Sequence, residues 1–229
     1  MIVDSIEARV SHILETLPPD VTLVAAAKSR TPEEVKAAIR AGVAHVGHNY
    51  VQEAERMIPA IKGKARWHMI GHLQRNKAKK AMPLFDMIET VDSWRLAVAV
   101  DRRCETLGKV MPVLVEINSG REATKTGVLP EDVDDLVRRL SGLEHIRVQG
   151  LMTMGPRFGD PEEARPYFRA TREAFERLSA LSSPNVTMRY LSMGMSNSYL
   201  VAIEEGANIV RIGTEIFGSR PEEKRGFAT

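Results

Sequence analysis

Short apolar runs alternate with segments of helical periodicity along most of the chain. Each run is too short for a helix and stops at a polar residue or a turn signal, so it predicts a buried strand. We expect strands at residues 22–27, 43–47, 66–70, 86–91, 112–117, 146–151, 187–191 and 209–212. Strands that alternate with helices predict βα units and a parallel sheet.

The segments between these runs carry recognisable helix signals. Thr31 is a predicted N-cap, Pro32 suits the first helical position, Glu34 completes a capping box, and Gly42 is a stop signal. Asp160 and the proline after it repeat the start signal. Apolar side chains at helical spacing predict two further helices, around residues 133–140 and 164–178.

Eight predicted strands with intervening helices indicate a (β/α)8 TIM barrel that forms a single domain over residues 1–229. An open doubly wound sheet is the alternative, but its G-x-G-x-x-G fingerprint is absent after the first strand. The stretch after the eighth strand is too short for a long closing helix. We therefore expect the amphipathic segment 6–17 to form an extra N-terminal helix on the outside of the barrel.

Composition narrows the class of protein. The chain has 229 residues and 43% hydrophobic content, enough to bury a full core. Lys plus Arg is 32 and Asp plus Glu is 30, with the signs mixed, which argues against a nucleic-acid arm or a polybasic membrane surface. Cys104 has no cysteine to pair with, and neither a leader nor a long apolar run is evident. We expect a cytoplasmic protein without nucleic-acid or membrane partners.

TIM barrels place their chemistry at the C-terminal ends of the strands, so the residues just after each apolar run are the candidate site residues. These are Lys28, Asn49, His72, Asn118, Met152, residues 192–196, Gly213 and Thr214. The barrel topology predicts that they share one mouth.

The last two of these loops favour a phosphate ligand. L-S-M-G-M-S and R-I-G-T-E-I-F-G supply small residues, hydroxyl groups and backbone N–H groups where barrels commonly bind phosphate. Alternatively, the glycines only make tight turns. Two such loops at the two expected places favour the phosphate interpretation.

Lys28 adds a reactive amine to this mouth. Partial desolvation there would lower the pKa of the lysine and favour the neutral amine that attacks an aldehyde. A phosphate-bearing aldehyde that condenses with lysine is pyridoxal 5′-phosphate (PLP). Alternatively, the Lys28 stem only covers the barrel rim. Arg211 lies within an apolar strand; if it points inward, it is available to the pyridine nitrogen of PLP.

The motifs together resemble a known family. They are A-A-A-K-S-R, G-H-N-Y-V-Q-E, W-H-M-I-G-H-L-Q-R-N-K, E-I-N-S-G-R-E-A-T-K-T-G, G-L-M-T-M, L-S-M-G-M-S and V-R-I-G-T-E-I-F-G-S-R. In this order they resemble the YggS/PROSC family of pyridoxal phosphate homeostasis proteins over nearly the whole chain. That family is similar to the barrel domain of bacterial alanine racemase, which implies a fold type III PLP site.

The resemblance implies a role for each matching residue. Lys28 matches the lysine of the internal aldimine, Asn49 an asparagine near the cofactor ring, and Arg211 the arginine at the pyridine nitrogen. The remaining matches are Ser196, Gly213 and Thr214 at the phosphate and Met193 beside the ring.

Several positions depart from the family pattern or have no assigned chemistry. His48 stands where Glu is frequent, Arg75 where Ser is common and Ser198 where Asp is frequent, which puts a neighbouring hydrogen-bond network in doubt. Lys125 matches a family lysine without an assigned role. The pair of histidines in W-H-M-I-G-H suggests a metal site, but no cluster of Cys or carboxylates completes it, so we expect structural histidines.

Two classes of function fit a PLP-binding barrel: a carrier that acts in PLP homeostasis, with apo-enzymes as partners, and a racemase or lyase. A class I aldolase is a third, weaker reading. Arg211 disfavours the protonated pyridine that lyase chemistry uses. Racemases of this fold also have the arginine, together with a C-terminal domain that brings a tyrosine base to a partner subunit. The sequence ends at Thr229, so we expect no such domain and predict a monomeric carrier without a second catalytic base.

Overall fold

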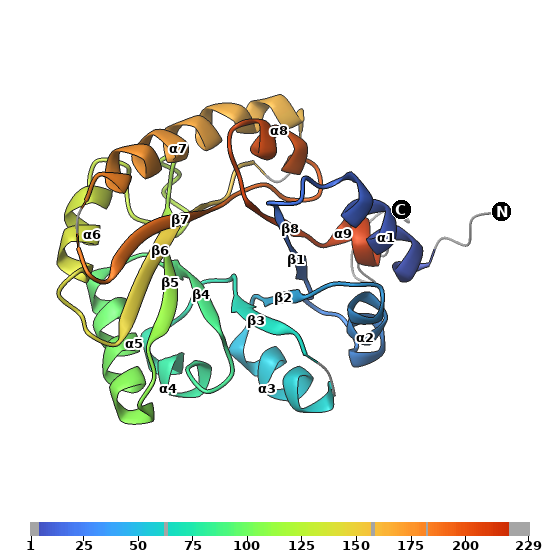
Figure 1. The fold of residues 1–229 in the computed structure, drawn as a ribbon, viewed down its shortest axis with the longest axis horizontal. Helices are drawn as coiled ribbons and strands as arrows, with labels where there is room; N and C mark the ends of the chain where they lie inside the picture. The colour runs from blue at the N-terminus through green and yellow to red at the C-terminus, as the bar shows by residue number, and fades with distance from the viewer. Residues whose placement is uncertain (1–4, 62–63, 157–158, 182, 220–229) are drawn as a thin grey trace.

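The computed structural model describes residues 5–61, 64–156, 159–181 and 183–219. Eight parallel strands close into a barrel in chain order (Figure 1). The strands are β1 (Thr22–Ala26), β2 (His45–His48), β3 (Arg66–Met69), β4 (Met87–Val91), β5 (Met111–Ile117), β6 (Ile146–Thr153), β7 (Val186–Ser192) and β8 (Ile209–Ile212). The predicted TIM barrel is confirmed.

Helices and short turns surround the barrel. They are α1 (Ile6–Thr16), α2 (Pro32–Arg40), α3 (Val51–Ala60), η1 (Arg75–Lys77), α4 (Ala78–Ala81), α5 (Trp94–Leu107), α6 (Val133–Leu140), η2 (Pro161–Ala164), α7 (Arg165–Ser179), α8 (Tyr199–Glu204) and α9 (Thr214–Phe217). Their buried faces pack on the outer face of the strands.

Strand β2 begins later than its apolar run, because the first residues of the run complete helix α2. Gly42 has φ +112°, and the Val43 N–H donates to the Ala38 carbonyl at 3.1 Å. These are features of a Schellman-type helix end, where glycine adopts the positive φ. The predicted capping box at the other end of α2 is also present, with Thr31 and Glu34 bonding reciprocally.

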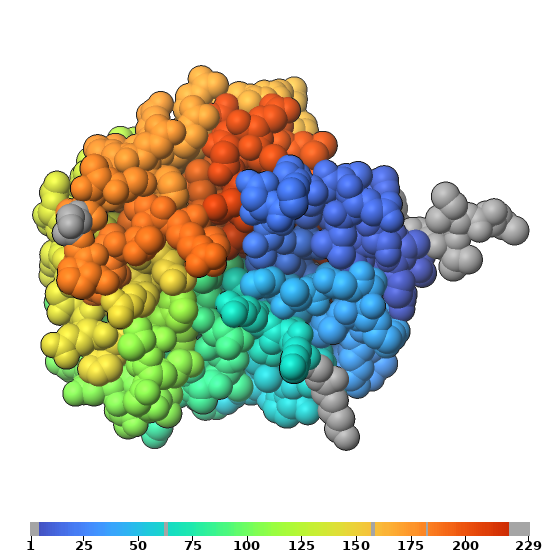
Figure 2. Space-filling model, in the orientation of Figure 1, coloured from blue at the N-terminus to red at the C-terminus, as the bar shows by residue number. Residues whose placement is uncertain are grey.

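The predicted N-terminal helix is α1, one residue shorter than expected at its end. Ser5 caps it by accepting from the Ala8 N–H at 3.1 Å, and Val10 and Ile13 are buried. The helix packs against α2 and α9, so segments from the two ends of the chain lie side by side (Figure 2). It lies on the outside of the barrel, as predicted.

The second helix-start signal produces a different local structure. The Asp160 side chain accepts from the Glu162 N–H, only two residues on, and the turn that follows is the 3-10 helix η2. The α-helix α7 begins directly after it, at Arg165. The tight cap therefore places one 3-10 turn ahead of the predicted helix.

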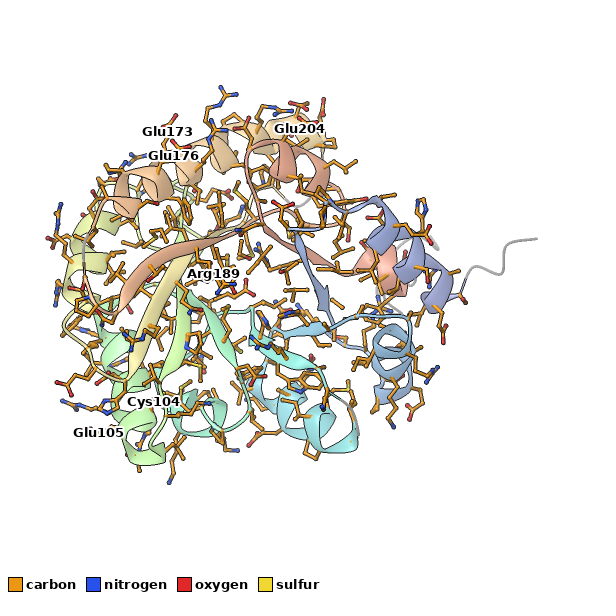
Figure 3. The ribbon with its side chains drawn as sticks, in the orientation of Figure 1. Cys104, Glu105, Glu173, Glu176, Arg189 and Glu204 are labelled. Atoms are coloured by element: carbon orange, nitrogen blue, oxygen red, sulfur yellow. The ribbon has the colours of Figure 1, made fainter. Side chains whose placement is uncertain are left out.

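Side chains fill two layers, one between the strands and helices and one inside the ring of strands (Figure 3). The inner apolar cluster consists of Val24, Ile70, Met87, Leu114, Met152 and Ile209. Because side chains alternate across a strand, residues two positions away from these also face inward. Four buried polar residues occupy such positions: His68, Glu89, Glu116 and Arg211. Ser192, also buried, lies two residues beyond Tyr190, which packs against this cluster.

Among the residues described, no helix has the length and apolar character needed to cross a membrane. The same residues contain no cluster of three or more His, Cys, Asp or Glu suited to hold a metal ion. The two histidines of W-H-M-I-G-H contact different carboxylates: His68 bonds Glu89, and His72 lies 3.4 Å from Asp92.

Candidate cofactor site

Lys28 lies at the C-terminal end of β1 and faces the barrel mouth. It is two residues beyond Ala26, which packs on the inner apolar cluster, and the Ala27 N–H still bonds β2 through the Gly47 carbonyl at 2.9 Å. The alternation of the strand therefore carries Lys28 inward. Its Nζ lies 5.1 Å from the centroid of the Tyr50 ring, a cation–π distance.

The turn after Lys28 is held by side chains from other elements. Ser29 adopts a φ of 60°, which is uncommon for a residue with a Cβ, and its N–H donates to Glu53 Oε2 on α3 at 3.3 Å. Arg30 donates to the carbonyls of Phe217 and Gly218 at the end of α9. These contacts join the Lys28 loop to α3 and to the end of α9.

The two predicted phosphate loops meet at the C-terminal end of β1. The Gly213 N–H donates to Ser196 Oγ at 3.2 Å, which connects the loop after β7 to the loop after β8. A Cβ at Gly213 would lie 3.3 Å from the Ala26 carbonyl oxygen, so this loop adjoins the end of β1. Thr214 is exposed and begins α9, where helical N–H groups have no intrahelical partner. The structure thus brings Ser196, Gly213 and Thr214 together.

Glycine is needed at one position of the first phosphate loop. Gly194 has φ +91°, and a Cβ there would lie 2.6 Å from the Ala202 Cβ and 2.8 Å from the Tyr199 Cα. Both contacts are shorter than packing allows. The loop can therefore fold tightly onto α8, which holds Ser196 near β8.

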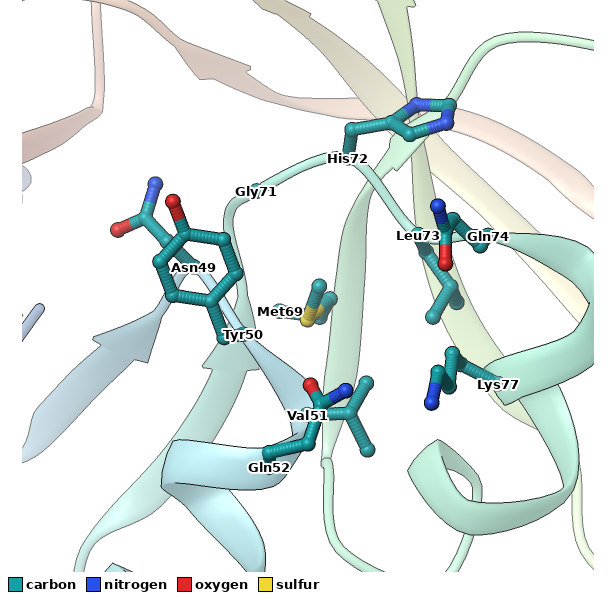
Figure 4. A pocket seen from close by; sticks show the side chains of 10 residues that line it. All are labelled: Asn49, Tyr50, Val51, Gln52, Met69, Gly71, His72, Leu73, Gln74 and Lys77. Carbon is teal, nitrogen blue, oxygen red and sulfur yellow. The ribbon is translucent and has the colours of Figure 1, made fainter.

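Asn49 and Tyr50 line a side pocket of the mouth, about 360 Å³ in volume (Figure 4). Asn49 is half-buried and lies two residues beyond the inward-facing Gly47. In Figure 4 it lies with Tyr50 on one side of the pocket, and His72 and Lys77 lie across from them. This pocket extends the site away from the phosphate loops, toward β3.

Met193 occupies a different environment from the other predicted residues. Its side chain is fully buried and belongs to the apolar layer between the strands and the helices. The preceding residue, Ser192, points into the barrel, and successive residues of a strand face opposite sides. The structure therefore does not bring the Met193 side chain to the mouth with Lys28.

Arg211 points into the barrel, which resolves the two orientations that the sequence left open. Its Nη1 donates to Ser192 Oγ at 2.6 Å and its Nη2 to the Thr153 carbonyl at 2.8 Å. Burial lowers the pKa of the guanidinium, while the charges of Glu89 and Glu116 act in the opposite direction. Arginine remains protonated in proteins, so a fixed positive charge lies inside the barrel.

Two buried carboxyl groups near Arg211 have pKa values shifted in opposite directions. Burial alone raises the pKa of Glu89, but hydrogen bonds from His68 and Ser192 and the charges of His68 and Arg211 outweigh it, so the pKa lies below its usual value. For Glu116 burial dominates and raises the pKa, although Thr126 donates to one carboxyl oxygen at 2.8 Å.

The sequence-based prediction did not include Glu89 in the site. The sequence does indicate Glu89, because a carboxylate lies within the apolar run M-I-E-T-V. Glu89 is two residues beyond the inward-facing Met87, so strand alternation turns it inward as well. Arg30 was also not predicted, although the motif A-A-A-K-S-R contains it. Its role depends on carbonyls almost two hundred residues away along the chain.

The three departures from the family pattern lie in separate places. His48 is fully buried and stacks on Trp67 with ring centroids 5.7 Å apart; burial lowers its pKa to about 4. Ser198 Oγ accepts from the Met195 N–H at 3.3 Å. Arg75 is exposed and lines a depression of about 690 Å³ at the rim.

Lys125, which had no assigned role, donates a hydrogen bond to the Glu122 carboxylate at 2.6 Å.

Comparison with known proteins places these features in a family. The model described as alanine racemase, N-terminal domain, matches residues 2–221. A pyridoxal phosphate homeostasis protein of Aquifex aeolicus is 42% identical over 199 residues, covering 86% of this chain and 86% of the relative.

Solved structures agree with this. The PipY protein of Synechococcus elongatus PCC7942 without PLP has a TM-score of 0.88 and 34% identity, covering 93% of this chain and 100% of that one. The same protein with PLP bound has a TM-score of 0.86, 33% identity and the same coverage. An alanine racemase of Clostridium difficile 630, at 18% identity and a TM-score of 0.76, shares the fold over 96% of this chain and 57% of its own. The chain therefore belongs to the family of pyridoxal phosphate homeostasis proteins, within the wider group that shares the alanine racemase N-terminal domain.

Proposed function

We propose that this chain binds PLP at the C-terminal mouth of its barrel, with Lys28 as the aldimine-forming residue, and acts in PLP homeostasis. The observation that carries the proposal is the arrangement of three elements. Lys28 faces the mouth, the loops of Ser196 and Gly213 meet at the C-terminal end of β1, and Arg211 lies inside the barrel. The PLP-bound structure of the similar PipY protein supports the choice of cofactor.

Each element has a separate task in this proposal. The cofactor supplies an aldehyde that reacts with an amine, and Lys28 presents that amine at the mouth. Ser196 and Thr214 offer hydroxyl groups, and the start of α9 offers N–H groups, to the phosphate. Asn49, directly after β2, would contact the ring, and Arg211 would donate to the pyridine nitrogen. In this role, holding and releasing the cofactor is the function, and no further acid or base is required.

Absorption spectroscopy of the purified protein tests the proposal. The PLP-loaded protein should absorb well above the protein band, and borohydride reduction should fix the cofactor to the peptide containing A-A-A-K-S-R. Lys28→Ala should be colourless. Lys125→Ala is the matched control, since it removes another half-buried rim lysine, and it should keep the band. If Lys28→Ala keeps the cofactor on another lysine at full occupancy, the assignment is wrong.

A racemase or lyase is the alternative function, and it requires a second group near Lys28. Tyr50 is favoured for that role by its 5.1 Å approach to the Lys28 Nζ. We expect solvent deuterium to enter the α-carbon of amino acids at a rate near that of free PLP, because a positioned base contributes about 10²–10⁴ in rate. Rapid exchange that is lost in Tyr50→Phe or His72→Asn would establish the enzyme instead.

The same proposal includes delivery of PLP to apo-enzymes, a monomeric state and a cytoplasmic location. Transfer is tested by mixing the PLP-loaded protein with a PLP-free transaminase and comparing the rate of activation with that given by equimolar free PLP. Sedimentation of the loaded and PLP-free protein tests the monomer. Activation no faster than that by free PLP would reduce the role to storage.

A further inference from the structure

A chain of hydrogen bonds runs through the barrel from Arg211 to the opposite end. Arg211 Nη1 donates to Ser192 Oγ at 2.6 Å, and Ser192 in turn donates to Glu89 Oε2 at 2.6 Å. The other Glu89 oxygen accepts from His68 Nδ1 at 2.6 Å, and His68 Nε2 lies 2.9 Å from His45 Nδ1. All five residues lie on strands, so the rigid sheet sets the spacing of the chain.

Glu89 is the point toward which both halves of this chain donate. An ionised carboxylate only accepts hydrogen bonds, so the proton between it and His68 belongs to Nδ1 of the histidine. Nε2 of His68 then accepts from His45, whose pKa is lowered to about 4, first by burial and then by the charges of His68 and Arg66. The negative charge of Glu89 thus faces the positive charge of Arg211 through one serine.

The guanidinium of Arg211 needs this support because it is 4% exposed. A buried charge without compensation is strongly disfavoured, and a long side chain without fixed partners has many rotamers. Ser192 and Thr153 take up two of its five N–H donors, which leaves three for a ligand in a defined direction.

We infer that Glu89 and His68 are positioning residues that orient and neutralise Arg211 for the ring nitrogen of the bound cofactor. The inference rests on the proposed function, since that function assigns the ring nitrogen to Arg211. Neither residue touches the mouth. His68 and His45 line a separate cavity of about 270 Å³ at the N-terminal end of the barrel, with Arg66, Asp86 and Arg189.

Glu116 provides a matched comparison inside the same barrel. It is 1% exposed, against 0% for Glu89, and its charge would also act on Arg211. Its bonded oxygen accepts from Thr126, however, and its Oε2 has no hydrogen-bond partner in the part of the chain that the structure describes. Burial raises the pKa of Glu116, whereas the partners of Glu89 lower its pKa, so Glu→Gln removes more negative charge at Glu89 than at Glu116.

The experiment compares equilibrium binding of PLP with that of a deaza analogue in which carbon replaces the ring nitrogen. The wild-type protein should prefer PLP by about tenfold or more, as expected for a hydrogen bond to a charged donor. Glu89→Gln should reduce this preference to about threefold or less, while Glu116→Gln should keep it. Affinity for the deaza analogue should stay within about threefold of wild type in both variants, since that ligand makes no bond that Arg211 could lose.

The outcomes separate this inference from the proposed function. A wild-type protein that binds both ligands equally overturns the role of Arg211 and this inference together. A full preference in Glu89→Gln, an equal loss of both ligands, or an equal effect in Glu116→Gln overturns the inference alone. If Glu89→Gln does not fold by circular dichroism, Ser192→Ala breaks the same connection and should show the same loss of preference.

Discussion

The mouth of the barrel and its interior are built in different ways. At the mouth, Lys28, Ser196 and Gly213 lie on loops, and the bond from the Gly213 N–H to Ser196 Oγ joins a backbone group of one loop to a side chain of another. In the interior, Arg211 and Glu89 lie on strands and are joined by side chains. The mouth can therefore lose one contact and keep its shape, whereas the interior depends on a balanced pair of buried charges.

Removing the Glu89 carboxylate should have the largest effect on stability. We expect Glu89→Ala to lower the free energy of unfolding by about 3–5 kcal/mol, because the Arg211 guanidinium would remain buried without compensation. Ser196→Ala, at the mouth, should cost only about 0.5–1.5 kcal/mol. Urea denaturation of the cofactor-free proteins measures both values. Equal losses would mean that the interior charges do not set the stability.

Lowering the pH should destabilise the protein through His48, a buried histidine in the outer layer. The folded-state pKa of His48, about 4, is below the unfolded value of 6.5, so its stabilising contribution is complete above pH 6.5 and is lost as the pH falls toward 4. The loss over this window is roughly 3 kcal/mol. His48→Phe keeps an aromatic ring against Trp67 and removes the titration, so its unfolding free energy should fall less between these pH values.

The control for this pH dependence is Glu89→Gln. The pKa of Glu89 is lowered, so its contribution is present above the unfolded value of about 4.3 and is lost only below it, as the pH falls through the folded pKa. Between pH 6.5 and 5 this variant should therefore follow the wild-type slope. A slope in His48→Phe identical to wild type would assign the acid sensitivity to another group.

The smallest effects should appear at the mouth, and in binding rather than in stability. Ser196→Ala and Thr214→Val each remove a hydroxyl proposed to bond the phosphate, so each should weaken PLP binding by about 1.5–3 kcal/mol. Binding of unphosphorylated pyridoxal should barely change. Titration with both ligands distinguishes the two effects, and equal losses for both ligands would remove the phosphate role.

Sequence periodicity located the strands because each apolar run is a local feature. The alternation along β1 was sufficient to direct Lys28 to the mouth, and the Gly42 stop signal was correct for α2 even though the residues after it joined the helix end instead of β2. The orientation of Arg211 was not predictable in the same way, because an isolated charge in an apolar run fits either face. The predicted place of Met193 beside the ring came from motif resemblance, and its side chain instead lies in the outer layer.

The amino-acid sequence by itself determined the order of the elements, the helix caps and the residues that follow each strand, because these depend on neighbours a few positions away. Only the tertiary structure decided the direction in which the pKa of each buried carboxyl shifts. Glu89 and Glu116 both lie in apolar strands, and nothing local distinguishes them. Closure of the barrel brings hydrogen bonds from His68 and Ser192 to Glu89, whereas among the residues described Glu116 accepts a side-chain hydrogen bond from Thr126 alone. Their ionisation therefore depends on strand register and burial, which bring together residues far apart in the chain.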